Sequence, residues 1–535
     1  MDDRRSLNPP KPEVLPRLRS ATLLLICMLP ALASLAQSAP QSFETLFATG
    51  FDNRRDLRAW DKRPPRRAFR LVRDSFTSGN KALRLRNREV SSHFLQKSFP
   101  AEAVAGRKLH LRLRLRNPGI TPPPRPASGL SIALRFTTPQ GEQYAQLPVS
   151  HDTAAWTSAG FTALVPPETI ACDLLLSLTE TKGEALYDDL ELRLFARDSN
   201  NLVMPSAQVA KGLRGAMITT YATAEDLRTL ASWGANHVRW QLTWNGFPAT
   251  PADTASLVSY RQWLDGALAH VKSLLPLCDS LHLRVLLDLH TLPGGRFPGF
   301  VYEHRMLRDI AWQTAFRDIW KDIAMQFRSQ PALWGYDLAN EPIEGLLPNF
   351  VLDWQSLAAV VAADIRSIDT THAIIVEAAP GGGPLALSMM NPLRGVHGAV
   401  YSLHMYEPLS FTGQNIHEAE APVQYPGVVN GKYWDKDSLR KVLQPLRDWQ
   451  QRHGTEIYVG EFSAVRWAPG SSAYSYIRDC ISIFEEWYWS WAYHAFREWG
   501  GWSVEHDSDA THHEPARTPT DRQLLLMEAF GRNKR

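Results

Sequence analysis

The chain has 535 residues, too many for one ordinary domain, and its composition of 44% hydrophobic and 21% charged residues is that of a globular protein with a large core. Its formal net charge of +3 is small for this length and gives no reason to expect a nucleic-acid partner. The four cysteines are scattered over separate segments and predict no disulfide framework. The fold must therefore depend on its apolar core.

An apolar run at residues 21–36 follows Arg17 and Arg19 and ends in small residues. This pattern is typical of a secretory signal peptide, and the run is too short for a comfortable membrane span. The segment before it, residues 1–16, is long and includes acidic residues, so an uncleaved N-terminal anchor is the alternative. We expect a secreted or periplasmic protein whose only membrane contact is made by residues 1–36.

Residues 42–199 contain short runs in which apolar and polar residues alternate, as they do in half-buried antiparallel strands. The clearest runs are Lys81–Arg86, Lys108–Arg116, Gly129–Phe136, Cys172–Leu178 and Tyr187–Phe195. Clusters of proline and glycine separate them. The pattern predicts an all-β sandwich domain of the jelly-roll type.

This predicted β domain resembles carbohydrate-binding modules in its opening Phe51-Asp52 and its closing Asp188–Leu192. The resemblance implies sugar binding, with Trp60 and Trp156 as candidate platforms, but both tryptophans also fit a core and the domain also fits an inert spacer. Residues 200–206 are expected to be a linker.

After the linker, apolar strands alternate with amphipathic helices. The predicted strands are Gly215–Ile218, His237–Trp244, Arg284–His290, Trp334–Asn340, His372–Ala378, Ala399–Met405, Ile457–Phe462 and Trp491–Trp499. The predicted helices are Ala224–Ala235, Tyr260–Ser280, Leu307–Arg328, Val351–Ile368, Asp437–His453 and Ser471–Trp487. This alternation predicts a (β/α)8 TIM barrel, of class α/β, over residues 207–535.

Polar residues recur at the ends of the predicted strands, and the carboxyl ends of barrel strands form the face that carries chemistry. These residues are Arg239, His290, Asn340, Glu341, His404, Tyr406, Glu461 and Trp499. The fourth strand ends in Asn340-Glu341-Pro342, where proline prevents continuation, and the seventh ends in Glu461. Two glutamates at one barrel face predict hydrolysis of a glycosidic bond by paired carboxylates.

These motifs resemble glycoside hydrolase family 5, the cellulase family. The resemblance covers residues 213–502 and rests on Val238-Arg239-Trp240, Asp288-Leu289-His290, Asn340-Glu341-Pro342, His404-Met405-Tyr406 and Gly460-Glu461-Phe462. It implies a retaining mechanism in which Glu341 is the acid/base and Glu461 is the nucleophile. The two carboxyl groups are then expected about 5–5.5 Å apart.

The resemblance also implies roles for the supporting residues. Asn340 is expected to hydrogen-bond the sugar 2-hydroxyl, an interaction that strengthens in the transition state. Arg239 and Tyr406 are expected to orient Glu461 and, for Arg239, to keep it ionised.

His290 and His404 are expected to form hydrogen bonds within the same site, His404 close to Glu341. Trp499 resembles the family's platform under the sugar, and Trp502 is the alternative.

Other polar residues are weaker candidates. Glu344, in the loop after Glu341, is interpreted as a solvated residue or a substrate contact, and Glu377 as a sugar contact. The cluster His506, Asp507, His512 and His513 has no fixed ligand spacing and is interpreted as a solvated tail, so we predict no metal site. No cofactor motif is apparent in the sequence.

The residues therefore predict a retaining glycoside hydrolase, cellulase-like and endo-acting on β-glucan, that works as a monomer on a polysaccharide or oligosaccharide. A β-mannanase, a glycoconjugate hydrolase and a transglycosylase share this chemistry and remain alternatives. A non-catalytic carbohydrate-binding protein is the alternative from another class, but the presence of both glutamates with Arg239 and Tyr406 argues against it.

Overall fold

The computed structural model describes residues 43–73, 81–125, 128–148, 153–195, 211–244, 256–297, 302–416 and 421–533. The expected signal segment at residues 1–36 and the expected linker at residues 200–206 lie outside the described residues. Within the described ranges, no helix has both the length and the apolar character that crossing a membrane requires.

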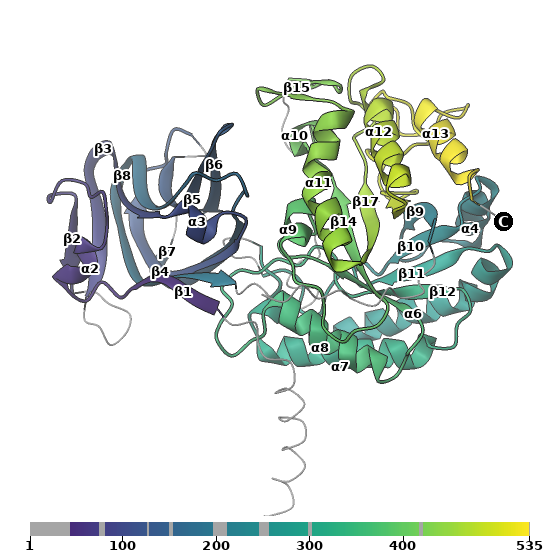
Figure 1. Ribbon diagram of the computed structural model, residues 1–535, viewed down its shortest axis with the longest axis horizontal. Coiled ribbons are helices and arrows are strands. Elements are labelled where there is room, and N and C mark those ends of the chain that lie inside the picture. Colours follow the sequence, from purple (N-terminus) through teal and green to yellow (C-terminus); the bar gives the residue numbers. More distant parts are fainter. Residues whose placement is uncertain are drawn as a thin grey trace, which may run out of the picture. The chain divides into compact units, whose positions relative to one another are not determined.

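The β domain is organised around its longest strand, β8 (Ala171–Phe195), which pairs antiparallel with β1, β3, β4 and β5 (Figure 1). The other elements are β1 (Phe43–Thr49), α2 (Arg54–Arg58), β2 (Phe69–Val72), β3 (Ala82–Phe99), α3 (Ala101–Val104), β4 (Lys108–Ile120), β5 (Gly129–Thr138), β6 (Gly141–Pro148) and β7 (Thr153–Leu164). The predicted antiparallel β domain is confirmed.

One difference from the predicted strands is that the runs Cys172–Leu178 and Tyr187–Phe195 belong to the single strand β8. The residues between them also pair, Thr181 with Ser91 and Gly183 with Asn87 of β3, so the strand does not end at this polar stretch.

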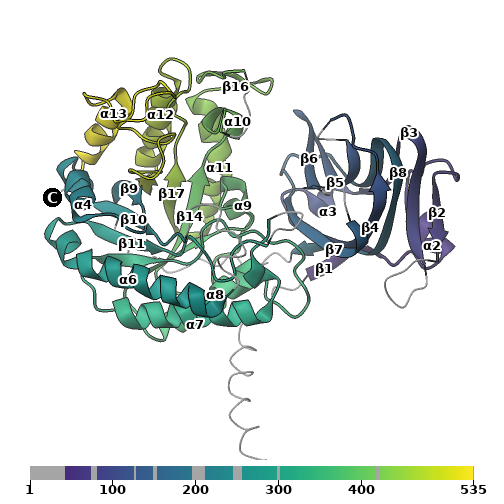
Figure 2. The same ribbon diagram turned by 180° about the vertical axis from the view of Figure 1, so that it is seen from behind.

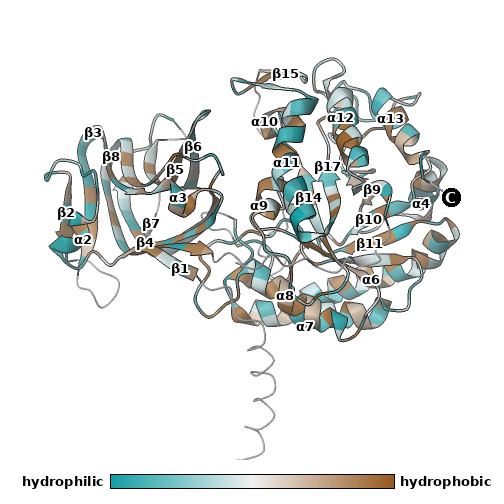
Figure 3. Cartoon of the chain, viewed as in Figure 1, coloured by the Kyte–Doolittle hydropathy of each residue, from teal (hydrophilic) through white to brown (hydrophobic). Residues whose placement is uncertain are grey.

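The core of the β domain is formed by alternate side chains of its strands. In β4, Leu109, Leu111, Leu113 and Leu115 are buried, and the polar residues His110, Arg112 and Arg114 lie between them. Figure 3 shows the same alternation as brown and teal bands along the strands. Trp60 is only 1% exposed and packs in this core, so its interpretation as a sugar platform is wrong. Trp156 is half-buried.

The second part of the chain is a closed barrel of eight parallel strands, in the order β10-β11-β12-β13-β14-β17-β18-β9 (Figure 2). They are β9 (Arg214–Ile218), β10 (His237–Gln241), β11 (Arg284–Asp288), β12 (Leu333–Asp337), β13 (Ala373–Glu377), β14 (Ala399–Met405), β17 (Glu456–Phe462) and β18 (Ser490–Tyr493). The predicted (β/α)8 fold is confirmed, although most strands are shorter than predicted.

Helices follow the barrel strands and pack on their outer side. They are α4 (Ala224–Ser232), α6 (Leu257–Ser280), η1 (Arg305–Leu307), α7 (Ile310–Phe327), α8 (Trp354–Arg366), α9 (Pro384–Ser388), α10 (Leu409–Thr412), α11 (Lys436–His453), α12 (Ser472–Glu486) and α13 (Asp521–Phe530). Side-chain oxygens of Thr223, Asp353 and Asp435 accept hydrogen bonds from the first turns of α4, α8 and α11, which explains where these helices begin. A small hairpin, β15 (Gly427–Val429) with β16 (Lys432–Trp434), precedes α11.

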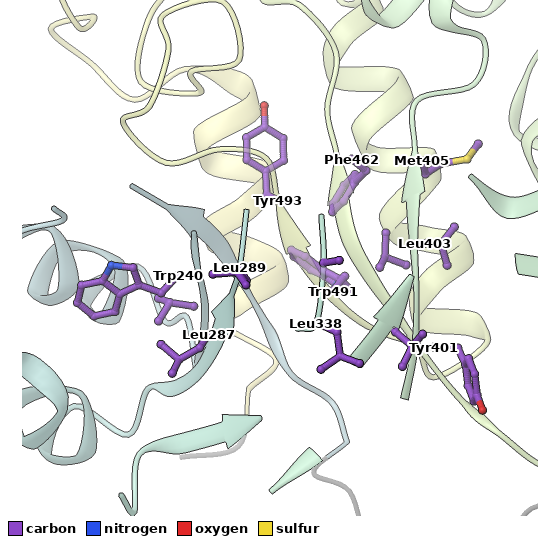
Figure 4. Close-up of a cluster of buried hydrophobic side chains, with 14 of the residues drawn as sticks. Trp240, Leu287, Leu289, Leu338, Tyr401, Leu403, Met405, Phe462, Trp491 and Tyr493 are labelled. Carbon is purple, nitrogen blue, oxygen red and sulfur yellow. The ribbon is translucent and has the colours of Figure 1, made fainter. Parts of the chain in front are cut away.

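Successive side chains of each barrel strand point alternately outward and inward. The outward ones are apolar and pack in one cluster with the helices, as Figure 4 shows for Trp240, Leu287, Leu403 and Phe462. The inward ones near the amino ends of the strands form a separate apolar layer: Leu213, Leu286, Trp334, Ala373, Ile375, Val400, Tyr458 and Ala492. The inward positions near the carboxyl ends are polar or charged except for Met217, which lies against Arg239, and they form the candidate site.

Candidate active site

Arg239 of β10 lies fully buried at the centre of the carboxyl end of the barrel. Its Nε donates to Asp337 Oδ2 at 2.9 Å, and its Nη1 donates to Glu461 Oε1 at 2.7 Å. Its Nη2 lies 3.0 Å from Glu377 Oε1 and 3.2 Å from Asp288 Oδ1. Burial opposes the charge, but these carboxylates hold the pKa of Arg239 well above its ordinary range. One cation therefore fixes acidic side chains from four strands.

Glu461, at the end of β17, is surrounded by groups that favour its ionised form. Besides Arg239, Tyr406 donates its hydroxyl to Glu461 Oε2 at 2.8 Å. Burial opposes the negative charge, but His404, His494 and Arg239 hold the pKa of Glu461 well below its ordinary range. Burial and the Glu461 carboxylate raise the pKa of Tyr406, so it keeps its proton and remains a donor. The expected orientation of Glu461 by Arg239 and Tyr406 agrees with this geometry.

Glu341 follows β12 with a left-handed backbone conformation, φ 45°, that a non-glycine residue adopts at a cost of about 1–3 kcal/mol. Its backbone N–H donates to Glu377 Oε2 at 2.9 Å, which fixes this turn. Its side chain is partly exposed and lies 3.0 Å from His404 Nδ1 and 3.7 Å from Arg296 Nη2. The Glu341 carboxyl is thus held at the open side of the site.

His404 of β14 connects the two glutamates. Its Nδ1 pairs with Glu341 Oε1, and its Nε2 lies 3.1 Å from Glu377 Oε1. Burial opposes protonation, but the carboxylates of Glu377 and Glu461 raise the pKa of His404 well above its ordinary range. A Cβ at position 460 would lie 2.7 Å from Ser402 Oγ and 3.2 Å from His404 Nε2, so glycine there leaves room for the His404 ring. His404 therefore lies next to Glu341, as expected.

Asn340 and His290 lie beside Arg239 at the same face. Asn340 Oδ1 accepts a hydrogen bond from Arg239 Nη2 at 3.2 Å, and its Nδ2 lies 3.3 Å from His290 Nε2. His290 Nδ1 is 2.8 Å from Asp288 Oδ2. The two residues therefore support each other, with Asn340 held in one orientation.

His494 and Glu498 belong to the site although the sequence analysis did not identify them. His494 directly follows β18, with its Nδ1 3.4 Å from Glu461 Oε2 and hydrogen-bonded to the Tyr406 hydroxyl. Its Nε2 is 3.0 Å from Glu498 Oε2. Burial opposes the charge, but Glu461 and Glu498 raise the pKa of His494 above its ordinary value. Ala492 of β18 points into the barrel, and alternation along the strand directs His494, two residues later, to the same side. This is the signal in the sequence that could have identified His494.

Trp499 does not lie at a strand end, because β18 stops at Tyr493. The loop after β18 folds back, and the Tyr493 hydroxyl donates to the Trp502 carbonyl at 2.7 Å. The Trp502 ring lies beside the site, with its centroid 5.9 Å from that of Tyr406. Trp499 is 41% exposed and packs edge-on against Trp502 and Trp467. The predicted strand end at Trp499 is wrong, and the alternative platform, Trp502, fits the geometry better.

Two glutamates are buried where the sequence analysis expected contact with solvent or sugar. Glu377 is fully buried against Arg239, His404 and the Glu341 backbone, so it holds the site together and has no free surface for a sugar. Glu344 is 1% exposed and pairs with Lys108, so its interpretation as a solvated residue or substrate contact is wrong.

The histidine cluster near the C-terminus is part of an ordered loop rather than a solvated tail. Arg466, only 3% exposed, donates to the carbonyls of Asp507, Asp509 and His512, and α13 follows this loop. His512 and His513 themselves are exposed.

The spacing of the two active-site carboxyls determines the chemistry available to them. Glu341, His404 and Glu461 each place one polar atom within 4.8 Å of the others. Carboxyl groups this close suit direct attack by one of them, whereas an inverting enzyme needs about 6.5–9.5 Å for a water between them. The same three atoms could each coordinate a cation, but hydrolysis by paired carboxylates needs none.

Comparisons with known proteins agree with this geometry. A sequence model described as "Cellulase (glycosyl hydrolase family 5)" matches residues 203–508, more than half of the chain. Endoglucanase C of Acetivibrio thermocellus is 27% identical over 292 residues, which cover 50% of this chain and 81% of that protein. Cellodextrinase A of Ruminococcus flavefaciens is 20% identical over 276 residues, covering 50% and 76%.

Among solved structures, a mutant Cel5A of Thermotoga maritima in complex with cellobiose is 22% identical and has a TM-score of 0.45, covering 59% of this chain and 96% of that one. With its family-model match, its parallel barrel and its endoglucanase relatives, the chain belongs to glycosyl hydrolase family 5, the cellulase family, and is a glycoside hydrolase.

Proposed function

We propose that the barrel is an endo-acting β-glucanase that hydrolyses its substrate with retention of configuration. The observation that carries this proposal is the spacing of Glu341 and Glu461, which have carboxylate oxygens within 4.8 Å of each other. The endoglucanase relatives support β-glucan as the substrate.

In the proposed first step, the Glu341 carboxyl gives its proton to the glycosidic oxygen while a Glu461 oxygen attacks the anomeric carbon. The bond from that carbon to the leaving sugar breaks, and a glycosyl ester forms on Glu461. In the second step, Glu341 removes a proton from water, the water oxygen attacks the same carbon, and the ester bond breaks. Each residue thereby returns to its starting protonation state.

The supporting residues have distinct proposed tasks. Arg239 and Tyr406 hold Glu461 as an oriented carboxylate, and both contact it directly. Asn340 is proposed to hydrogen-bond the sugar 2-hydroxyl, with its amide orientation set by Arg239 and His290. Trp502 or Trp499 provides the aromatic surface for the sugar ring.

The test is hydrolysis of a panel of soluble polysaccharides: carboxymethyl cellulose, mixed-linkage glucan, xyloglucan and mannan. Glu341→Gln is the matched control, because it keeps the size and polarity of the side chain but supplies no acidic proton. Cleavage of a β-glucan that is lost in the control supports the proposal. Cleavage of mannan alone would overturn the choice of substrate, and activity equal to wild type in the control would overturn the role of Glu341.

We also propose that residues 1–36 are a signal segment, that the enzyme acts as a secreted or periplasmic monomer, and that the β domain contributes to polysaccharide binding. Mass spectrometry of the protein recovered outside the cytoplasm tests the first point, since cleavage predicts a mature N-terminus shortly after the apolar run. Light scattering tests whether the enzyme is a monomer. A pull-down on insoluble cellulose, with Trp156→Ala as the control, tests whether the β domain contributes to polysaccharide binding.

A further inference from the structure

The loop that carries Glu341 has a buried charge of its own. This loop, the β12–α8 loop, comprises residues 338–353 and includes Glu344, whose side chain is 0% exposed. Glu344 Oε1 accepts the backbone N–H of Trp354 at 3.0 Å. A carboxylate buried this completely requires a counter-ion, because its desolvation is otherwise uncompensated.

The counter-ion of Glu344 comes from the β domain. Lys108 Nζ, at the start of β4, lies 2.5 Å from Glu344 Oε2, and the Thr162 hydroxyl of β7 donates to the same oxygen at 3.3 Å. Lys108 is itself largely buried, at 13% exposure of its side chain. The charge of the β12–α8 loop is thus neutralised by a residue more than 200 positions earlier in the chain.

The β domain also binds the backbone of this loop. Burial and Arg193 lower the pKa of His110 well below its ordinary value, so its ring is neutral. Arg193 Nη2 donates to His110 Nδ1 at 2.8 Å, which leaves the proton on Nε2, 2.7 Å from the Gly345 carbonyl. Arg193 also donates to the Leu347 carbonyl at 3.3 Å.

Two glycines allow this close approach. A Cβ at Gly160 of β7 would lie 3.0 Å from the Gly345 carbonyl oxygen, so a larger residue would push the loop away. A Cβ at Gly345 would lie 1.9 Å from Glu303 Oε2, on the barrel side of the loop. The loop is therefore fixed between Glu303 and the β domain.

We propose that the β domain is a positioning part of the hydrolase: Lys108, Thr162 and His110 hold the β12–α8 loop, and thereby hold the Glu341 carboxyl next to His404. This inference rests on the proposed acid/base role of Glu341. The strained backbone of Glu341 at the start of the loop gives the physical reason, because such a conformation persists only where its surroundings fix it.

The test compares Lys108→Met with wild type in the full-length chain, on two substrates. One is the polysaccharide that wild type cleaves, and the other is a 2,4-dinitrophenyl glycoside of the same sugar, whose leaving group needs no acid catalysis. A misplaced Glu341 is expected to lower kcat about tenfold or more on the polysaccharide, with KM within about twofold. On the activated glycoside, kcat/KM, which reports the first bond cleavage and not the later attack of water, is expected to change far less.

Three further variants sharpen the result. The double variant Lys108→Met/Glu344→Gln removes both charges and is expected to recover much of the lost kcat, since no unpaired carboxylate remains buried. Thr162→Val is expected to lower kcat on the polysaccharide by a smaller factor, again with less effect on the activated glycoside. It replaces Lys108→Met in the test if that variant does not fold. Arg135→Met is the matched control, because it breaks an ion pair with Asp173 within the β domain, away from the loop.

Equal losses of kcat/KM on both substrates, or wild-type kcat on the polysaccharide in a folded Lys108→Met variant, would overturn the inference. Wild type that cleaves no glycan at all would instead contradict the proposed function, so the two failures are distinguishable.

Discussion

The two ends of the barrel interior are built from the same strands but have opposite chemistry. Near the amino ends, the inward side chains form the apolar layer that contains Leu286, Trp334 and Ile375. Near the carboxyl ends, the next inward positions of the same strands are Asp288, Asp337 and other charged residues, assembled around Arg239.

The difference shows how the protein separates stability from reactivity. The apolar layer gains free energy from burial, about 25 cal/mol for each Å² removed from water. In the charged layer, ions are desolvated, and the layer persists because each carboxylate faces Arg239 or His404. Burial there is useful because fixed charges act strongly where water is excluded.

Removal of the nucleophile should have the largest effect and only on chemistry. Glu461→Ala is expected to lower kcat by about 10⁴-fold or more, because no ester can form. Circular dichroism should show an unchanged fold, and hydrolysis of the preferred glucan measures the loss. Full activity in this variant would remove the assignment of Glu461.

Removal of the central cation, Arg239, should lower both the stability of the protein and its turnover. Arg239→Met leaves its surrounding carboxylates buried without their shared partner, and breaking such a pair costs about 3–5 kcal/mol. Urea denaturation measures the free energy of unfolding, and kinetics on the folded fraction measures turnover. Unchanged stability would contradict the central role of Arg239.

A cavity in the apolar layer should affect stability alone. Ile375→Ala removes a fully buried side chain and is expected to cost about 2–5 kcal/mol of unfolding free energy. Because Ile375 belongs to the apolar layer near the amino ends of the strands, kcat at low temperature should stay within about twofold of wild type. A large fall in kcat in the folded variant would show that the two layers are coupled.

The smallest expected effect is a pH-dependent one at His494. Its raised pKa means that its contribution to stability is fully present below about pH 6.5, the ordinary histidine value, and is lost as pH rises through the raised pKa. His494→Gln should therefore lower Tm more at pH 5 than at pH 9. Melting curves of both proteins across this range measure the difference, and an equal or opposite trend would exclude a charged His494.

Much of the barrel could be predicted because its strands follow a simple rule. Their positions at the ends of predicted strands brought Arg239, His404 and Glu461 to one face of the barrel, and the proline after Glu341 marked where a strand ends. His494 was missed because the strand was predicted to continue past Tyr493, where β18 ends. Ala492 points into the barrel, so alternation would have placed His494 there as well.

The burial of Glu344 could not be predicted from local sequence. A glutamate in a loop ordinarily remains solvated, and its burial depends on Lys108 and Thr162 of another domain. The same holds for Trp60, whose neighbours in the core, Phe47 and Phe51, are recognisable only once the strands are paired. Contacts between distant segments, not local propensity, decide these cases.

The most direct test of the retaining mechanism is the configuration of the first product. Proton NMR during hydrolysis of a soluble β-glucan by the wild-type enzyme resolves the two anomers of the new reducing end before they interconvert. Double displacement through Glu461 predicts that the β-anomer accumulates first and the α-anomer appears later by mutarotation. Initial accumulation of the α-anomer would contradict the roles assigned to Glu341 and Glu461.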